Sequence, residues 1–158
     1  MPDTLATGGD RVSRQVTART IALGFAAGVL SVLVFHQGTV WLLHMAGVLP
    51  AGPYSVRPIP PFGVPQIANQ CFWGGLWGVL IAVLLRRVRA PNLDLLFGAV
   101  FGAVALSFVN WVVLPAIKGL PYFAGGVPAR LAAGLLIGGA FGWGVALVLR
   151  ALRGARGV

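Results

Sequence analysis

Two histidines are the side chains of this sequence best suited to ligate a metal ion or a haem group. His36 and His44 both lie toward the end of the first apolar segment. Neutral imidazole binds both kinds of group. However, eight helical residues separate the two rings by about 80° around the helix axis and by about 12 Å along it. No Cys, Asp or Glu stands near them, so we predict no metal site and no bound cofactor.

Amide side chains near the ends of the apolar segments form a second candidate group. Gln37 follows His36, while Gln66, Asn69 and Gln70 have the spacing i, i+3, i+4, which puts them on one helix face. Asn110 falls at a similar depth in a later segment. We expect convergence on an outer-leaflet polar patch, below His44 and Lys118, made of His36, Gln37, Gln66, Asn69, Gln70 and Asn110. Three roles stay open for it: hydrogen bonds that fix helix register, a site for a ligand or lipid headgroup, or a subunit interface.

The sequence offers no pattern for catalysis. Ser31 and Ser107 lie within apolar segments, and Ser31 stands five residues before His36, so the two side chains point away from each other on a helix. No acidic residue lies in the interior of an apolar segment, which removes carboxylate-pair hydrolysis and argues against proton-coupled antiport. We predict no catalytic residues and no enzymatic activity.

The overall composition explains where these polar residues must reside. The chain has 158 residues, of which 58% are hydrophobic, 9% are charged and 23 are glycine. A soluble globule of this size could not hide so much apolar surface, whereas a bilayer accepts it in stretches of about 20 residues. The sequence therefore predicts an all-α, polytopic membrane protein.

Four long apolar runs predict four transmembrane helices joined by short connections. The first run follows an arginine-bearing leader and has no small-residue cleavage site, which favours a retained helix over a removed signal peptide. The predicted helices cover about 21–43, 67–85, 93–117 and 131–149, with outer loops at 44–66 and 118–130, a cytoplasmic N-terminal segment at 1–20 and a cytoplasmic C-terminal tail at 150–158.

Basic residues predict the orientation of these helices. Nine of the 12 Lys and Arg residues fall in the leader, the second connection and the tail, and only Arg57, Lys118 and Arg130 fall on the other side. The positive-inside rule then places both termini in the cytoplasm of a cell membrane, which we expect to be a bacterial inner membrane. We expect the arginines to contact anionic lipid headgroups, and no nucleic acid, because stacking aromatics do not accompany them.

The two halves of the chain carry the same features in the same order, which predicts a duplicated two-helix unit. Gly24 precedes His36 by twelve residues, as Gly98 precedes Asn110. Pro-Tyr and Gly-Val-Pro follow in both outer loops, and Trp-Gly-Val begins at Trp77 in one half and at Trp143 in the other. Two helices per unit give both copies the same orientation, so this would be a parallel repeat.

Small residues spaced by four occur in all four predicted helices. Such spacing lets helix backbones approach closely in lipid. The glycines concerned are Gly24, Gly28, Gly74, Gly78, Gly98, Gly102, Gly134, Gly138 and Gly142. They predict helix packing, either inside a four-helix bundle or, for the ridge on the last helix, against another chain.

These observations favour a non-catalytic membrane subunit, either an accessory component of a larger complex or a protein that forms homo-oligomers. The alternative is a small permease or channel for a neutral or anionic solute. Its site would use the outer polar patch beneath the proline-rich loop, where cations occur without carboxylates. Loss of transport on replacing His36 or Asn110 separates the two hypotheses.

Overall fold

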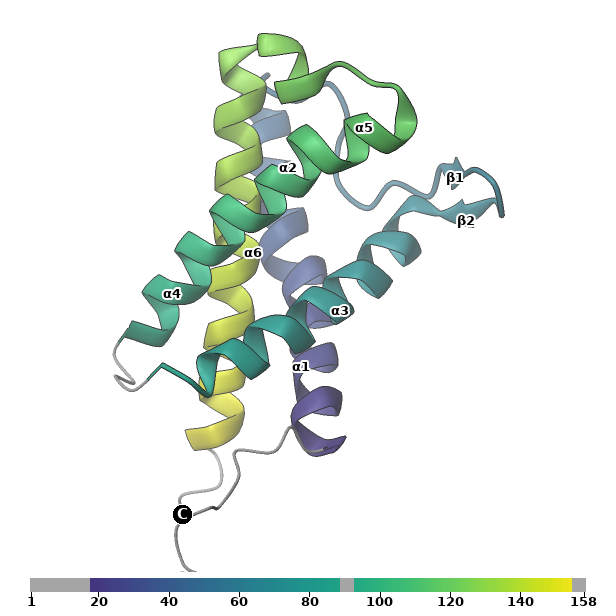
Figure 1. The fold of residues 1–158 in the computed structure, drawn as a ribbon. Coiled ribbons are helices and arrows are strands. Elements are labelled where there is room, and N and C mark those ends of the chain that lie inside the picture. The colour runs from purple at the N-terminus through teal and green to yellow at the C-terminus, as the bar shows by residue number, and fades with distance from the viewer. Residues whose placement is uncertain (1–17, 89–92, 155–158) are drawn as a thin grey trace, which may run out of the picture.

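The computed structural model describes residues 18–88 and 93–154, which fold into four long helices with short connections (Figure 1). All four helices are long and apolar enough to cross a membrane, which makes the chain a multi-pass membrane protein. We refer to them as spans 1 to 4: Ala18–Met45, Gln66–Leu85, Asp94–Lys118 and Pro128–Leu152. Each predicted helix is found, and the first and fourth extend several residues beyond the predicted ends.

Spans 1 and 3 are interrupted by π-helical turns. Span 1 consists of α1 (Ala18–Ser31), the π-helical η1 (Val32–His36) and α2 (Gln37–Met45). Span 3 consists of α4 (Asp94–Phe101), the π-helical η3 (Gly102–Leu106) and η4 (Val109–Val113), and α5 (Leu114–Lys118). Pro115 has no amide hydrogen to donate back along the helix, and it lies two residues after the end of η4, in the first turn of α5. Spans 2 and 4 are the regular helices α3 (Gln66–Leu85) and α6 (Pro128–Gly154).

Spans 1 and 2 cross at a contact made by glycine backbone. A methyl group placed on Gly28 would collide with the carbonyl oxygen of Gly74, and one placed on Gly78 would collide with that of Gly24. Ala82 closes the crossing on Gly24, whose added methyl group would lie 2.9 Å from the Ala82 Cβ atom. The absence of side chains at these positions is what permits the close approach.

Spans 3 and 4 cross in the same way. A methyl group on Gly102 would collide with the Gly138 carbonyl oxygen, and one on Gly142 would collide with the carbonyl oxygen of Gly98. Ala146 takes the place that Ala82 has in the first crossing, at the same 2.9 Å from the methyl group added to Gly98. The chain therefore contains two helix pairs with matching contacts.

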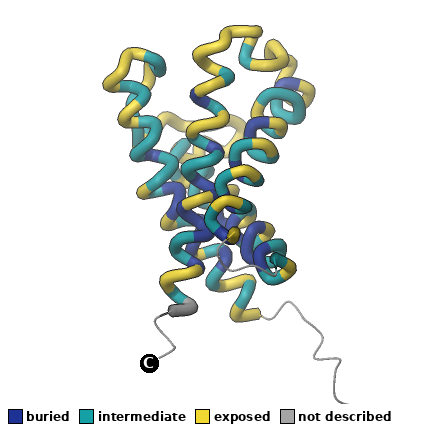
Figure 2. The backbone as a smooth tube through the Cα atoms, turned by 90° about the vertical axis from the view of Figure 1, so that its left-hand side faces the viewer, coloured by how far each residue is buried: buried dark blue, intermediate teal, exposed yellow. Residues whose placement is uncertain are grey.

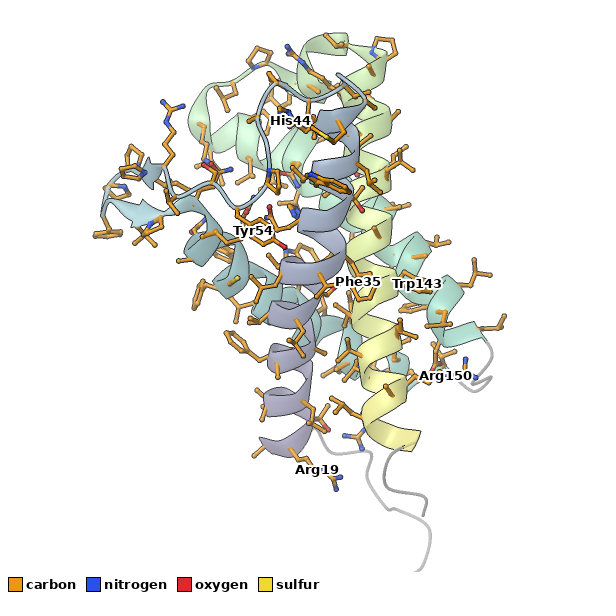
Figure 3. The ribbon with its side chains drawn as sticks, turned by 180° about the vertical axis from the view of Figure 1, so that it is seen from behind. Arg19, Phe35, His44, Tyr54, Trp143 and Arg150 are labelled. Carbon is orange, nitrogen blue, oxygen red and sulfur yellow. The ribbon has the colours of Figure 1, made fainter. Side chains whose placement is uncertain are left out.

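A third close contact joins the two pairs, between span 1 and span 4. The Ser31 hydroxyl donates a 2.6 Å hydrogen bond to the Phe141 carbonyl, and the Phe35 ring lies against Gly144. Phe35 and Trp143 meet edge to face with ring centroids 5.5 Å apart (Figure 3). Spans 1 and 4 thus form the centre, and spans 2 and 3 pack mainly on their own partners.

The buried core lies toward one end of the molecule. Its members come from spans 1, 2 and 4, and include Ala27, Val32, Ile81, Phe141 and Val145. Figure 2 shows the buried residues in the middle and lower parts of the fold, while the upper helix ends stand apart. Close packing is therefore concentrated at and around the glycine crossings.

Arginines of spans 1 and 4 mark one end of the molecule. Arg19 and Arg150 both lie there, together with the end of α3 and the beginning of α4 (Figures 1 and 3). Arg86 donates a 3.0 Å hydrogen bond to the Thr20 hydroxyl, which ties the end of span 2 to the beginning of span 1. The predicted tail is partly helical, since α6 continues to Gly154.

Both connections at the opposite end are irregular. The longer one contains a two-stranded antiparallel hairpin, β1 (Pro58–Ile59) and β2 (Val64–Pro65), which leads directly into α3. The shorter one contains η5 (Tyr122–Gly126), in which Phe123, Ala124 and Gly125 have positive φ angles. The hairpin projects to the side of the helices and does not lie over their ends (Figure 1).

Candidate functional site

Gln37 is the centre of the polar residues that the structure brings together. It is buried at the junction of η1 and α2, and its Nε2 atom donates a 2.9 Å hydrogen bond to Oε1 of Gln70 on span 2. The same amide nitrogen lies 3.4 Å from His36 Nδ1. Its Oε1 atom accepts a 2.8 Å hydrogen bond from the main-chain amide of Tyr54. One side chain therefore links two spans and a loop.

Tyr54 completes this group from the longer connection, between spans 1 and 2, and we call the four residues His36, Gln37, Tyr54 and Gln70 the polar clasp. Its φ angle is +55°, an unusual value for a residue with a side chain. The strain is offset by two hydrogen bonds, one through the amide and one from the phenol hydroxyl to the Leu33 carbonyl at 2.7 Å.

The π-helical turn explains why the Leu33 carbonyl is available to Tyr54. In a regular helix the Gln37 amide would donate to Leu33. Here that amide donates to the carbonyls of Val32 and Val34. The Tyr54 hydroxyl takes the position of the missing helical donor, so the turn and the loop stabilise each other. Figure 3 shows Tyr54 on the span 1 side of the molecule, below His44.

The other predicted patch residues are not part of the polar clasp. Asn110 is exposed, and its side chain donates a 2.9 Å hydrogen bond to the Leu106 carbonyl of its own helix. Gln66 and Asn69 are half-buried, and within the described ranges neither side chain makes a hydrogen bond. The expected convergence of six residues was therefore wrong for Asn110, because spans 2 and 3 separate toward this end.

The two residues expected above the patch have separate surroundings. His44 donates a 2.9 Å hydrogen bond through Nδ1 to the Leu49 carbonyl and so shapes the turn that follows span 1. Lys118 is exposed at the end of α5. In the described part of the chain no three His, Cys, Asp or Glu side chains gather as metal ligands would.

Sequence reasoning did not single out Tyr54 as a member of the site. The Pro-Tyr pair was noted only as a feature of the repeat. A tyrosine after proline in a loop signals a turn, but the partner of its hydroxyl depends on the π-helical turn in span 1. No feature of the local sequence around Val32–His36 predicts that turn.

A groove on spans 3 and 4 is the second candidate site. It has a volume of about 480 Å³, opens to the outside and is lined by apolar side chains, among them Ala99, Ala103, Leu136, Gly139 and Trp143. Its floor would accept a methyl group on Gly139 without a clash, in ordinary van der Waals contact 3.5 Å from the Ala99 carbonyl oxygen. It suits an apolar group.

The first helix pair has no such space at the matching place. The glycine crossings match Gly74 with Gly138 and Gly78 with Gly142, so Gly75 corresponds to Gly139. The ring of Phe25 lies directly on Gly75. Phe25 stands one residue after Gly24, as Ala99 stands one residue after Gly98. The groove is thus the place that an aromatic ring fills in the other pair.

Comparison of the chain with protein family models, with curated proteins and with solved structures finds no match.

Proposed function

We propose that this chain is a non-catalytic subunit of a membrane assembly, which associates with another transmembrane helix through the groove on spans 3 and 4. The observation that carries the proposal is the difference between the two helix pairs at Gly75 and Gly139. One pair buries its glycine under Phe25, and the other leaves its glycine half-buried and flanked by Ala99 and Ala103.

A second copy of the chain is the partner that we favour. Two copies inserted in the same direction lie at the same depth, so a twofold axis along the membrane normal sets the groove of one against the groove of the other. The rim carries Leu136, which is 56% exposed and one turn away from Gly139. Small residues beside a large apolar one are typical of close helix association in lipid.

The arrangement of the polar clasp supports this function over a permease. Gln37 uses both ends of its amide for contacts within the protein, and Tyr54 uses both its amide and its hydroxyl in the same way. A transport site needs polar groups that are free to bind the solute. Hydrogen bonds that fix the register of spans 1 and 2 account for these residues.

We also propose that the chain arose by duplication of a two-helix unit. The paired contacts of the two crossings support it, since Gly24, Gly28 and Ala82 are used like Gly98, Gly102 and Ala146. The match extends to the polar clasp: Gln37 meets Gln70, and at the corresponding positions Trp111 lies against Gly134. The parallel orientation follows from two helices per unit.

The proposed setting is the inner membrane of a bacterium with both termini in the cytoplasm. Arg19, Arg86 and Arg150 lie at the ends of spans 1, 2 and 4 that carry most of the basic residues. Anionic headgroups of the cytoplasmic leaflet are the expected partners of these side chains.

The test is to fill the groove with the ring that the first pair already has. Ala99→Phe should lower self-association in lipid at least tenfold while leaving the thermal stability of the monomer nearly unchanged. Energy transfer between two labelled populations, measured over a range of protein-to-lipid ratios, reports association. Ala26→Phe is the matched control, because Ala26 is exposed on span 1 and the added ring should point into lipid there.

Four results are informative. Association that Ala99→Phe weakens and Ala26→Phe preserves supports the proposal. The protein could instead be monomeric at every protein-to-lipid ratio, while native mass spectrometry of protein extracted from its own membranes detects a different bound polypeptide. The partner is then that polypeptide and not a second copy. A monomer without protein partners overturns the proposed function, as does solute flux in proteoliposomes that is abolished by Gln37→Leu.

A further inference from the structure

The β1–β2 hairpin carries an exposed apolar surface that none of the functions above uses. It pairs Pro58 with Pro65 and Ile59 with Val64, and its tip residue Phe62 is 87% exposed. The hairpin extends to the side of the helices and not above them, as both Figure 1 and Figure 3 show. Within the described part of the chain, Ile59 is half-buried, whereas Phe62 and Val64 are exposed.

The height of the hairpin is fixed by span 2. The helix α3 begins at Gln66, one residue after β2, and its 20 residues are about 30 Å long, which equals the hydrocarbon thickness of a bilayer. The amide of Gln66 donates to the Arg57 carbonyl and that of Ile67 to the Ser55 carbonyl, both at 3.0 Å. These bonds tie the segment that leads into the hairpin to the first turn of span 2, the end at which that helix is expected to leave the hydrocarbon.

The composition of the hairpin and of the residues before it suits this boundary and not water. Arg57 is the one charged side chain between Tyr54 and Gln66. The exposed residues around it are Val56, Pro58, Pro60, Pro61, Phe62, Gly63, Val64 and Pro65. Four of the eight residues from Pro58 to Pro65 are prolines, which have no amide hydrogen, and the Gly63 amide donates to the Ile59 carbonyl. Few backbone donors remain unpaired, which lowers the cost of leaving water.

We propose that this hairpin is a membrane anchor that inserts Phe62 among the acyl chains of the adjacent leaflet, with Arg57 at the level of the lipid phosphates. The hairpin continues the lipid-facing surface of span 2, where Phe72 and Trp73 are more than half exposed. An arginine beside apolar residues complements the negative charge of phosphate. The inference is independent of the proposed assembly and of which side of the membrane is cytoplasmic.

The test measures the depth of residue 62 in a bilayer. Phe62→Cys in a Cys71→Ala background is labelled with an environment-sensitive nitrobenzoxadiazole probe and placed in nanodiscs of phosphatidylcholine and phosphatidylglycerol, one chain per disc. Quenching by iodide reports contact with water, and quenching by lipids with nitroxides on the acyl chains reports depth. Ala51→Cys, in the exposed turn before Tyr54, is the reference for water, and Val104→Cys, exposed on span 3, is the reference for hydrocarbon.

We expect the probe at 62 to be quenched by acyl-chain nitroxides at least fivefold more than the probe at 51, and to be protected from iodide nearly as well as the probe at 104. Iodide quenching equal to that at 51 overturns the anchor. The anchor is also overturned if acyl-chain nitroxides do not quench the probe with one chain per disc and protection from iodide appears only with two chains per disc. In that case a second protein chain, and not lipid, covers the hairpin.

Discussion

Gln37 and Tyr54 are seventeen residues apart and are joined by a 2.8 Å hydrogen bond from the Tyr54 amide to the Gln37 side-chain oxygen. The bond crosses from a loop to a membrane-spanning helix, at a point where the same glutamine also holds Gln70 of the next span. This single contact explains why the loop has a defined path, and the first two predictions follow from it.

Replacing Gln37 with leucine should loosen the loop more than the helices. The change leaves the Tyr54 amide and the Gln70 side chain without their partner, which costs about 1–3 kcal/mol. Hydrogen exchange at the Tyr54 amide should accelerate at least tenfold, while exchange in the glycine crossings changes little. Thr39→Val is the control, because its hydroxyl bonds only to the Phe35 carbonyl of its own helix. Equal exchange at Tyr54 in Gln37→Leu and wild type contradicts the role given to Gln37.

Replacing Tyr54 with phenylalanine should remove only the hydroxyl bond to Leu33. The main-chain bond to Gln37 stays, so the loss should be about 1 kcal/mol of unfolding free energy. A double-mutant cycle with Gln37→Leu measures how far the two bonds support each other. Additive losses would mean that they hold the loop separately, contrary to the single clasp described above.

Adding a methyl group at a glycine crossing should destabilise the protein strongly for so small a change. Gly28→Ala meets the backbone of Gly74 and Gly75, and we expect a loss of about 1–3 kcal/mol, as for overpacking of a core. Gly38→Ala is the matched control on the same span, since nothing lies within 4 Å of the added group. Thermal unfolding in detergent should show a lower Tm for Gly28→Ala alone. Equal Tm values for the two variants would contradict the crossing.

Two buried serines should respond differently to the same substitution. Ser31→Ala removes the hydrogen bond to the Phe141 carbonyl and should cost about 1 kcal/mol. The Ser107 hydroxyl has no partner among the described residues, so Ser107→Ala should be neutral or slightly stabilising. Chemical or thermal unfolding of both variants in the same detergent compares them directly. A larger loss for Ser107→Ala would point to a partner for its hydroxyl in the membrane-embedded protein.

The four helices were predictable because their signal is cumulative. Each span is a stretch of at least 20 mainly apolar residues, and no single position decides its existence. The helix ends were less predictable, since Ala18 and Pro128 begin helices outside the apolar runs that were read as spans. Where a helix ends depends on contacts with the connecting segment next to it, and mean hydropathy carries no information on these contacts.

Individual polar contacts could be predicted only where sequence spacing fixed them. Gln37 and Gln70 were expected to converge because both lie near the outer ends of successive helices, and they are in contact. Asn110 had the same predicted depth but lies on a helix that diverges from span 2. The depth of a residue along its helix follows from counting residues. The distance between two helices at that depth depends on how they pack at the glycine crossings, which counting does not predict.

The proposed repeat can be aligned by sequence strings or by helix contacts, and the two alignments differ. The Trp-Gly-Val strings align Trp77 with Trp143. The crossings instead align Gly78 with Gly142, so the residue that corresponds to Trp77 in span 4 is Phe141. A shift of two residues turns a helix position by about 200°, to nearly the opposite face. Backbone contact is therefore the better guide to equivalent positions.

The glycine crossings have a consequence for how this sequence can diverge. Their close approach depends on the absence of a few atoms at Gly24, Gly28, Gly74 and Gly78, and at their counterparts in the second pair. Most other residues of the spans are not buried within the chain, and in lipid one aliphatic residue substitutes for another at little cost there. Relatives should therefore keep the spacing between small residues while most other residues change. This spacing would still indicate common ancestry after overall sequence identity has been lost.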